Sequence, residues 1–213
     1  MSTSRTGAVL AATLLFVTSC AVTSCAHTTP GTPQAAPEAP TGQAACATVD
    51  VPFLDVESHS DTEPRVRIPQ PPGWDRYTDM DSEMIRAAMV NKSLSADGFT
   101  PNVVFTLDKV PGEFDPQELF DQGRQTMVTM LGATDVQTSS STVCGLPAET
   151  THYTISIPAD IGPHPAVVRS AVIASGDSTY MVSLSMQSTQ ADDPTYVRDS
   201  ATILDGMQVL PPK

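Results

Sequence analysis

The sequence is poor in the residues that most catalytic and binding chemistry requires. Among its 213 residues are four cysteines, four histidines, one tryptophan and eleven lysines plus arginines, against 24 aspartates plus glutamates. The basic residues form no cluster, which argues against a nucleic-acid partner and against electrostatic docking on anionic lipid. The formal net charge of −13 is adequately explained by solubility.

Motifs for metals and cofactors are also missing from the sequence. No His-x-x-x-His pair, no Cys-x-x-Cys and no acidic loop with calcium-binding spacing occurs, so we expect no metal site. There is no glycine-rich phosphate loop and no Gly-x-Ser-x-Gly elbow. The sequence therefore predicts no cofactor and offers no established catalytic motif.

One weak catalytic signal remains at Gly176–Ser178, which resembles the start of the nucleophile block of GDSL-type hydrolases. Ser178 could form a triad with His152 or His164 and one of many aspartates. That block normally lies near the start of its domain with a histidine downstream, whereas no histidine follows Ser178 here. We interpret the tripeptide as a turn between two strands and keep a serine hydrolase as the alternative function.

The N-terminal segment carries the strongest signal in the chain. Arg5 precedes an apolar run over 8–17, which is too short to span a membrane and is typical of a secretory signal peptide. Two copies of Val-Thr-Ser-Cys follow, ending at Cys20 and Cys25, and each resembles a bacterial lipobox. In a lipobox the cysteine is acylated, for example with palmitate, and the preceding peptide is removed. Residues 1–24 are therefore predicted to be a lipoprotein signal peptide.

Two arguments about the acylated cysteine point in opposite directions. The apolar run ends at Val17, which favours Cys20. Cleavage before Cys25 leaves one cysteine for the lipid and a pair, Cys46 and Cys144, for a disulfide, whereas cleavage before Cys20 leaves an odd thiol in an exported protein. We favour Cys25 as the lipidation site and keep Cys20 as the alternative.

The chain after the signal peptide divides into a tether and one domain. Residues 25–45 consist mainly of Pro, Thr, Ala and Gly with one charged side chain. Such a composition cannot bury enough apolar surface to offset the entropy of ordering, which predicts a disordered tether. Residues 46–213 have the size of one domain with a core of its own.

Alternation of apolar and polar residues dominates this domain and predicts half-buried strands. The expected strands cover 66–68, 103–107, 153–157, 166–174 and 180–187, with a weaker, mixed run over 84–92. Gly176-Asp177 separates the last two strands as a turn. Hairpin connections of this kind suit an antiparallel sheet.

Two segments have helical spacing instead, and each begins with Asp-Pro. Asp115-Pro116-Gln117-Glu118 has a capping-box arrangement, and Gly132 is expected to end that helix. Asp193-Pro194 opens the second, whose apolar residues recur as far as Met207. Helices that pack their apolar faces on an antiparallel sheet give an α+β domain with two or more helices.

This order of elements resembles the LpqN/LpqT lipoprotein family of mycobacteria and other actinobacteria, whose domains are similar to the PsbP-like α/β/α sandwich. The resemblance covers roughly 60–210 and rests on Ile68-Pro69 through Trp74, the helix capped by Asp115, and Gly145–Ala148. These marks are structural, so the resemblance implies a cell-envelope lipoprotein without an established enzymatic motif. It also implies a role in envelope-lipid transport or in contacts with partner proteins. Cys46 and Cys144 depart from the family pattern.

We therefore expect a non-catalytic lipoprotein, exported and anchored by its lipid to the outer face of the cell membrane or cell envelope. Its domain would bind a partner protein or an envelope lipid, with an envelope serine hydrolase as the alternative. A lipid carrier needs an apolar cavity, for which Phe105, Leu119 and Met127 are the expected lining. An interaction module needs an exposed patch, for which Trp74 and Tyr77 are the candidates, although Trp74 could instead fill the core.

Overall fold

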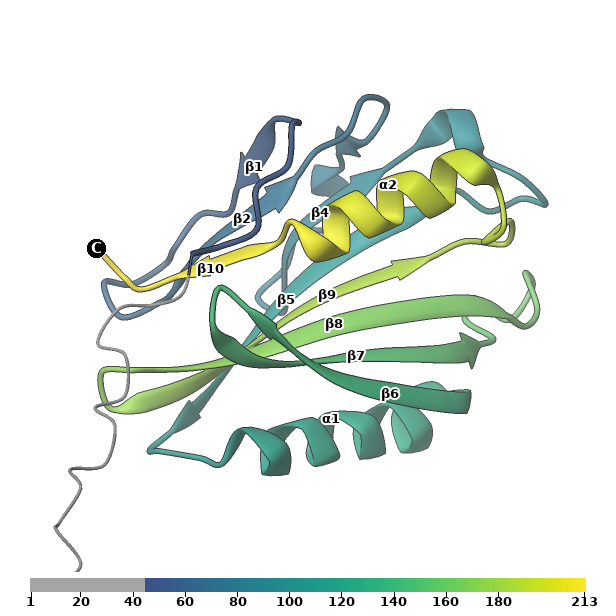
Figure 1. Ribbon diagram of the computed structural model, residues 1–213. Coiled ribbons are helices and arrows are strands. Elements are labelled where there is room, and N and C mark those ends of the chain that lie inside the picture. Colours follow the sequence, from purple (N-terminus) through teal and green to yellow (C-terminus); the bar gives the residue numbers. More distant parts are fainter. Residues whose placement is uncertain (1–44) are drawn as a thin grey trace, which may run out of the picture. The chain divides into compact units, whose positions relative to one another are not determined.

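The computed structural model describes residues 45–213 (Figure 1). The predicted signal peptide, both lipobox cysteines (Cys20 and Cys25) and almost all of the predicted tether lie outside the described residues. Within the described part of the chain, no helix combines the length and the apolar character needed to cross a membrane.

A seven-stranded antiparallel sheet organises the domain. Its strands in spatial order are β3 (Asp75–Arg76), β4 (Ile85–Val90), β5 (Asn102–Pro111), β9 (Ser178–Gln187), β8 (His164–Ser175), β7 (Leu146–Ile155) and β6 (Thr134–Val143). Strands β6 to β9 form a meander, in which each strand pairs with the next along the chain. Pairing of β5 with β9 then places the earlier strands beside the later ones.

A second, three-stranded sheet joins the two ends of the domain. It contains β1 (Phe53–Asp55), β2 (Arg65–Pro69) and β10 (Gln208–Leu210), with β2 in the middle. Both pairings are antiparallel. Two single-turn 3-10 helices, η1 (Thr78–Met80) and η2 (Lys92–Leu94), flank β4.

Both helices begin at the predicted Asp-Pro pairs, which confirms the α+β fold class. They are α1 (Pro116–Leu131) and α2 (Pro194–Asp205). The side chains of Asp115 and Asp193 each accept a hydrogen bond from the backbone N–H two residues further on, at 2.7 and 2.8 Å. Proline fits the first helical position because that N–H has no partner within a helix. Gly132 ends α1 as predicted, in the left-handed conformation with φ of 66°.

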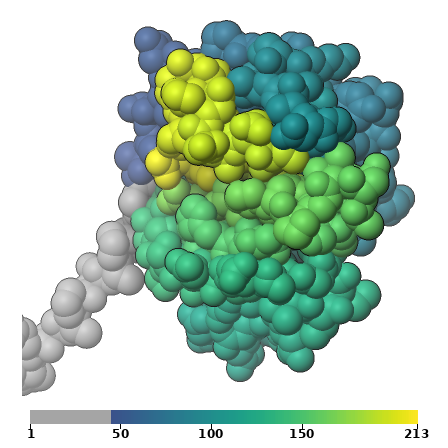
Figure 2. Space-filling model, turned by 90° about the vertical axis from the view of Figure 1, so that its right-hand side faces the viewer, coloured from purple at the N-terminus to yellow at the C-terminus, as the bar shows by residue number. Residues whose placement is uncertain are grey.

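The two helices cover opposite faces of the large sheet (Figure 1). On the α2 side, the inward side chains of β9 are fully buried against β2, β5 and α2; they are Tyr180, Val182, Leu184 and Met186. In the space-filling view the yellow residues of α2 pack against teal residues of the β4–β5 region and green residues of the later strands (Figure 2). The main core therefore lies between the large sheet, α2 and the small sheet.

The α1 side holds two smaller apolar clusters. Leu119 and Phe120 of α1 pack on Val172 of β8, and Met127 packs on a cluster that includes Tyr153. Phe105 faces the other side of the sheet, where it stands opposite Leu184 and belongs to the main core. These residues therefore do not line a common apolar cavity of the kind that a lipid carrier would need, because the sheet separates Phe105 from Leu119.

Cys46 and Cys144 form the disulfide that the cysteine parity predicted. Cys144 and Gly145 make the tight turn between β6 and β7, and both have positive φ, as a two-residue hairpin requires. The bridge therefore joins the start of the described chain to a turn that lies 98 residues further on.

Candidate functional site

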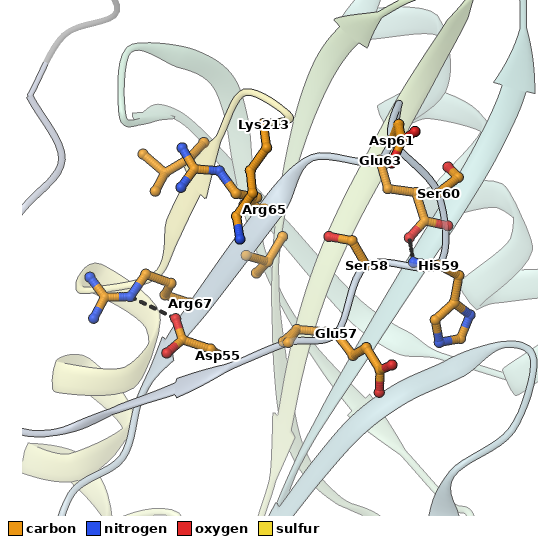
Figure 3. A pocket seen from close by; sticks show the side chains of 13 residues that line it. Asp55, Glu57, Ser58, His59, Ser60, Asp61, Glu63, Arg65, Arg67 and Lys213 are labelled. Atoms are coloured by element: carbon orange, nitrogen blue, oxygen red, sulfur yellow. Dashed lines mark hydrogen bonds and ion pairs between the residues drawn. The ribbon is translucent and has the colours of Figure 1, made fainter.

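A polar cleft opens beside the small sheet and is the main candidate site (Figure 3). Its volume is about 920 Å³, and it is lined by β2, the loop 56–64 between β1 and β2, and residues at the C-terminal end. A smaller hollow of about 250 Å³ lies against the same loop and is lined on its other side by β4. The loop 56–64 therefore contributes to both openings.

Strand β2 supplies basic side chains to this cleft because of its alternation. Val66 and Ile68 are buried in the main core, so Arg65 and Arg67 project to the opposite side. The guanidinium Nε of Arg65 donates to the carbonyl oxygen of Pro211 at 3.0 Å. This bond holds the C-terminal segment along the edge of the cleft.

Arg67 fixes the three strands of the small sheet to one another. Its Nε donates to Asp55 Oδ1 of β1 at 2.9 Å, and its Nη1 donates to Gln208 Oε1 of β10 at 3.2 Å. Its guanidinium also lies 4.4 Å from the centre of the Phe53 ring, within the range of a cation–π contact. Arg67 therefore serves mainly to build the wall of the cleft.

The loop 56–64 is held by an ion pair that is shielded from solvent. Both guanidinium Nη atoms of Arg86 on β4 donate to the Glu63 carboxylate, at 3.2 and 2.9 Å. The two side chains are 6% and 13% exposed. Arg86 also donates to the carbonyl oxygen of Glu57, and the backbone N–H of His59 donates to Glu63 at 2.6 Å.

These contacts shift the ionisation of Glu63. Burial alone raises the pKa of a carboxyl group, but the hydrogen bonds from Arg86 and from the His59 backbone favour the charged form. The positive charge of Arg86 acts in the same direction, and the net result is a pKa below the ordinary value of 4.5. Glu63 is therefore a charged anchor of the loop at neutral pH.

A second set of contacts seats the same loop on the large sheet. The hydroxyl groups of Thr62 and Tyr180 share a hydrogen bond of 2.9 Å, although Tyr180 is otherwise a core residue of β9. Ser175 of β8 donates to the carbonyl oxygen of Thr62 at 2.8 Å. The loop is thus fixed at Thr62 and Glu63, and its preceding residues line the cleft.

Several charged groups in the cleft remain available to a ligand. Within residues 45–213, the carboxylates of Glu57 and Asp61 and the ammonium group of Lys213 have no hydrogen-bond or ion-pair partner. In Figure 3 the basic side chains of Arg65 and Lys213 lie on one side and the loop residues on the other. The cleft therefore presents both signs of charge to a polar ligand. Its described residues include no group of three or more side chains placed to hold a metal ion.

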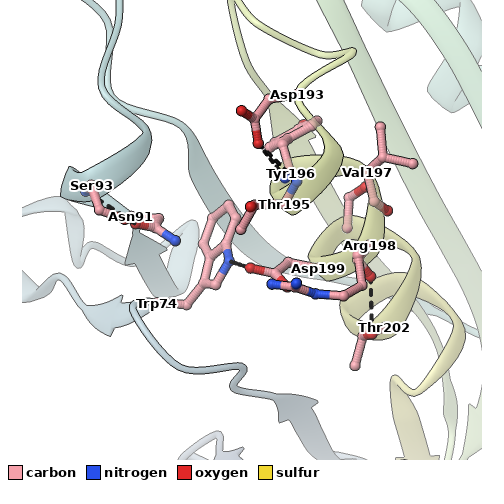
Figure 4. Close-up of polar contacts among 11 residues, drawn as sticks. Trp74, Asn91, Ser93, Asp193, Thr195, Tyr196, Val197, Arg198, Asp199 and Thr202 are labelled. Carbon is pink, nitrogen blue, oxygen red and sulfur yellow. Dashed lines mark hydrogen bonds and ion pairs between the residues drawn. The ribbon is translucent and has the colours of Figure 1, made fainter.

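Trp74 does not form the exposed aromatic patch that was one of its two expected roles. It is 1% exposed, and its indole N–H donates to Asp199 Oδ2 of α2 at 3.0 Å (Figure 4). The other oxygen of Asp199 accepts two hydrogen bonds from Arg198. The Trp74 ring also lies 6.3 Å from that of Tyr196, so it joins β3 to α2 within the core. Tyr77 is only half-buried, but without Trp74 there is no aromatic pair at the surface.

The residues proposed for a catalytic triad are far apart. Ser178 stands opposite Ser175 at the last residue of β8, whereas His164 is the first residue of that strand. Eleven residues of extended strand span roughly 36 Å. His152 is opposite Val167, which is about 26 Å from Ser175 by the same measure.

His164 and Ser178 have structural partners instead. The ring of His164, the first residue of β8, is buried and hydrogen-bonded to the carbonyl oxygen of Gly162 and to Gln187. Ser178 donates to Asp177 at 3.1 Å in the predicted turn. No serine hydroxyl in residues 45–213 is hydrogen-bonded to a histidine ring, so the geometry gives the hydrolase alternative no support.

The fold and the cleft together define an α+β domain in which an antiparallel sheet lies between two helices and a polar surface cleft adjoins a smaller sheet. The model of the probable lipoprotein LpqN family matches residues 47–210, and the chain belongs to this family. This result confirms the resemblance found in the sequence.

Solved structures share the fold. LpqN of Mycobacterium tuberculosis, described as involved in cell envelope biogenesis, is 17% identical with a TM-score of 0.61; the match covers 76% of this chain and 93% of that chain. The PsbP protein of Synechocystis sp. PCC 6803 is 12% identical with a TM-score of 0.52, over 80% of this chain and 99% of that chain. A comparison with curated proteins finds no match.

Proposed function

We propose that this protein is a non-catalytic lipoprotein of the cell envelope whose domain binds a partner protein through the polar cleft. The observation that carries the proposal is the set of charged groups in the cleft, Glu57, Asp61 and Lys213, that have no partner among the described residues. Charged groups that have no partner within the domain favour recognition of a complementary charged segment. Membership of the LpqN family and the envelope role stated for the LpqN structure support the location.

An envelope lipid is the second ligand class and is less well supported. An acyl chain would need an apolar cavity, and the residues expected to line one lie on opposite faces of the sheet. Most residues that line the cleft are charged or carry a hydroxyl group, and its apolar lining residues are Val56, Val66 and Leu210. It suits the polar part of a ligand better than its hydrocarbon chains.

The proposal includes a lipid anchor at Cys25, with Cys20 as the alternative site. Acylation adds about 0.8 kcal/mol of membrane affinity for each buried methylene group, so the chains would hold the protein on a membrane that it does not cross. The domain would then stand on the outer face of the cell membrane or cell envelope.

The decisive experiment is purification of the lipidated protein from its native membrane, followed by mass spectrometry of co-purifying proteins and lipids. We expect a stoichiometric protein that is lost from the variant Glu57→Lys plus Asp61→Lys. The matched control, Glu113→Lys plus Asp160→Lys, makes the same change in net charge at exposed positions outside the cleft and should retain it. Recovery of an abundant lipid without a protein would overturn the partner-protein proposal in favour of a carrier.

A further inference from the structure

Strand β6 is the long free edge of the large sheet. It pairs with β7 on one side, and no strand in the described part of the chain pairs with its other side. The opposite edge, β3, has two residues, and the outer strands of the small sheet, β1 and β10, have three each. A ten-residue edge strand presents a row of unpaired N–H and C=O groups on which another strand can form.

Within residues 45–213, strand β6 is open to solvent, apart from Arg169 of β8, whose guanidinium Nη2 donates to the carbonyl oxygen of Thr142 at 3.3 Å. All residues from Gln137 to Thr142 are exposed. Helix α1 packs on β7 and β8 instead, through residues such as Leu119 and Phe120 that contact Val172. The edge is therefore accessible along most of its length.

Strand β6 also lacks most of the sequence and structural features that prevent an edge strand from pairing with another chain. Exposed edges are usually protected by lysine, proline, inward-pointing charges or bulges. The one irregularity in β6 lies at its start, between Thr134 and Gln137, and the pairing is regular from there to Val143. Residues 136–148 contain no charged side chain, although 16% of the whole chain is charged.

We propose that β6 pairs antiparallel with β6 of a second copy of this chain, about a two-fold axis at Ser139–Ser141. In this register Ser140 stands opposite Ser140, Ser139 opposite Ser141 and Thr138 opposite Thr142, so hydroxyl groups can hydrogen-bond across the strands. No like charges meet, which matters for a chain with a net charge of −13. The edge is thus complementary to itself.

The predicted tether of this chain is a poor occupant of the same edge. It contains Pro30, Pro33, Pro37 and Pro40, and proline has no N–H to donate to a sheet. No stretch long enough to match the regular part of β6 is free of proline. A second copy fits the edge better than the tether does.

The pairing depends on a high local concentration of the protein. One strand pairing buries less than the roughly 1,200 Å² that is typical of stable complexes. Copies confined to one membrane surface meet at a much higher effective concentration than copies free in solution. In this respect the inference rests on the proposed lipid anchor.

Cysteine cross-linking in membranes tests the pairing directly. The variant Ser140→Cys places a thiol at the two-fold axis, where opposite residues approach to about 4.5–5.5 Å between Cα atoms. We expect a short bifunctional thiol reagent to produce a covalent dimer at least tenfold more efficiently than with the control Gln122→Cys on the exposed side of α1. Both residues are exposed, so both variants should unfold at the temperature of the parent protein.

A second variant separates strand pairing from chance collision. Adding Thr138→Lys and Thr142→Lys to Ser140→Cys places charges along the edge and should abolish the cross-link, whereas Gln125→Lys and Thr129→Lys on α1 should leave it unchanged. Equal cross-linking from Gln122→Cys, insensitivity to the edge lysines, or a product with a protein of another mass would each overturn the proposal.

The same samples are separated into membrane and soluble fractions, and the amount of the protein in each fraction is measured. If the chain is found in the soluble fraction, the anchor proposal fails, and the cross-link is then measured at matched concentration in that fraction. A dimer there supports the edge pairing, and its absence overturns it.

Discussion

Asp199 is a carboxylate with only 2% of its surface exposed, in a position where an unpaired charge would be costly. Its two oxygens are divided between the indole N–H of Trp74 and the guanidinium group of Arg198. Trp74 is the one tryptophan of the chain and is itself buried. This contact therefore fixes α2 against the segment that leads into β3. Because Trp74 is buried, its fluorescence reports on the state of the core.

The variant Asp199→Ala should destabilise the domain by about 1–3 kcal/mol, because the buried indole N–H loses its acceptor. Asp199→Asn keeps an acceptor oxygen and should cost less. Denaturant unfolding followed by the fluorescence of Trp74 measures both values. The control Asp192→Ala changes an exposed side chain and should stay within about 0.5 kcal/mol of the parent. Equal losses for Asp199→Ala and the control would refute a structural role for the contact.

At the scale of elements, the loop 56–64 depends on the ionised form of Glu63. Its pKa is lower in the folded protein than the ordinary value of 4.5, so ionisation favours the folded state. This contribution is fully present above the unfolded pKa and is lost as the pH falls through the folded pKa.

The variant Glu63→Gln should therefore be less stable than the parent at neutral pH, and the difference should shrink below about pH 4 as the carboxylate of the parent becomes protonated. Denaturant unfolding between about pH 3 and pH 7 measures this difference. The variant Glu113→Gln, at an exposed position with no ion-pair partner among the described residues, should show no such convergence. A difference that stays constant with pH would show that the charge of Glu63 is unimportant.

The sequence predicted the elements that bury a periodic apolar face. The alternating segments became β2, β5, β7, β8 and β9, the weaker run over 84–92 became β4, and both Asp-Pro helices formed. Residues 134–143 escaped prediction because an edge strand that is exposed on both faces has no alternation to detect. The segments that form β1, β3 and β10 are too short for any periodic pattern.

The cleft could not be predicted either, because most of the segments that form it carry no periodic pattern. Its walls are β1, β2, β10 and an irregular loop, and the pairing of β2 with β10 joins residues that no local pattern relates.

The sequence also leaves the role of Trp74 open. A tryptophan beside a Pro-rich turn suits a surface patch or a core, and only the position of Asp199 on α2 decides between them.

At the scale of the whole molecule, the disulfide between Cys46 and Cys144 limits the freedom of the unfolded chain. Closing a loop of 98 residues contributes up to roughly 4–5 kcal/mol on the chain-entropy model. A reductant should therefore lower the free energy of unfolding of the parent by a few kcal/mol. The variant Cys46→Ala plus Cys144→Ala should be less stable from the outset and should not respond to the reductant. Free thiols at Cys46 and Cys144 in the purified protein, detected by alkylation and intact mass, would contradict the bridge.

Variants of the two lipobox cysteines test the proposed lipid anchor. If Cys25 carries the lipid, Cys25→Ala should release the protein to the soluble fraction, and Cys20→Ala should leave it on the membrane. Detergent partitioning measures both. The opposite pattern would assign the lipid to Cys20, and partitioning that is unchanged in the double variant would refute the lipoprotein signal. The released domain should still fold, because its core lies within the described residues.

The small sheet makes the cleft depend on contacts between segments that lie far apart in the sequence. Arg67 and Gln208, which are hydrogen-bonded across β2 and β10, are 141 residues apart. A folding domain can complete the β6–β9 meander while the cleft is still absent, because pairings between distant residues form late. Pairing of β10 with β2 then closes the site. A binding-competent cleft would thus report that the two ends of the domain have come together, and a domain with β10 detached would keep much of its large sheet without binding the ligand.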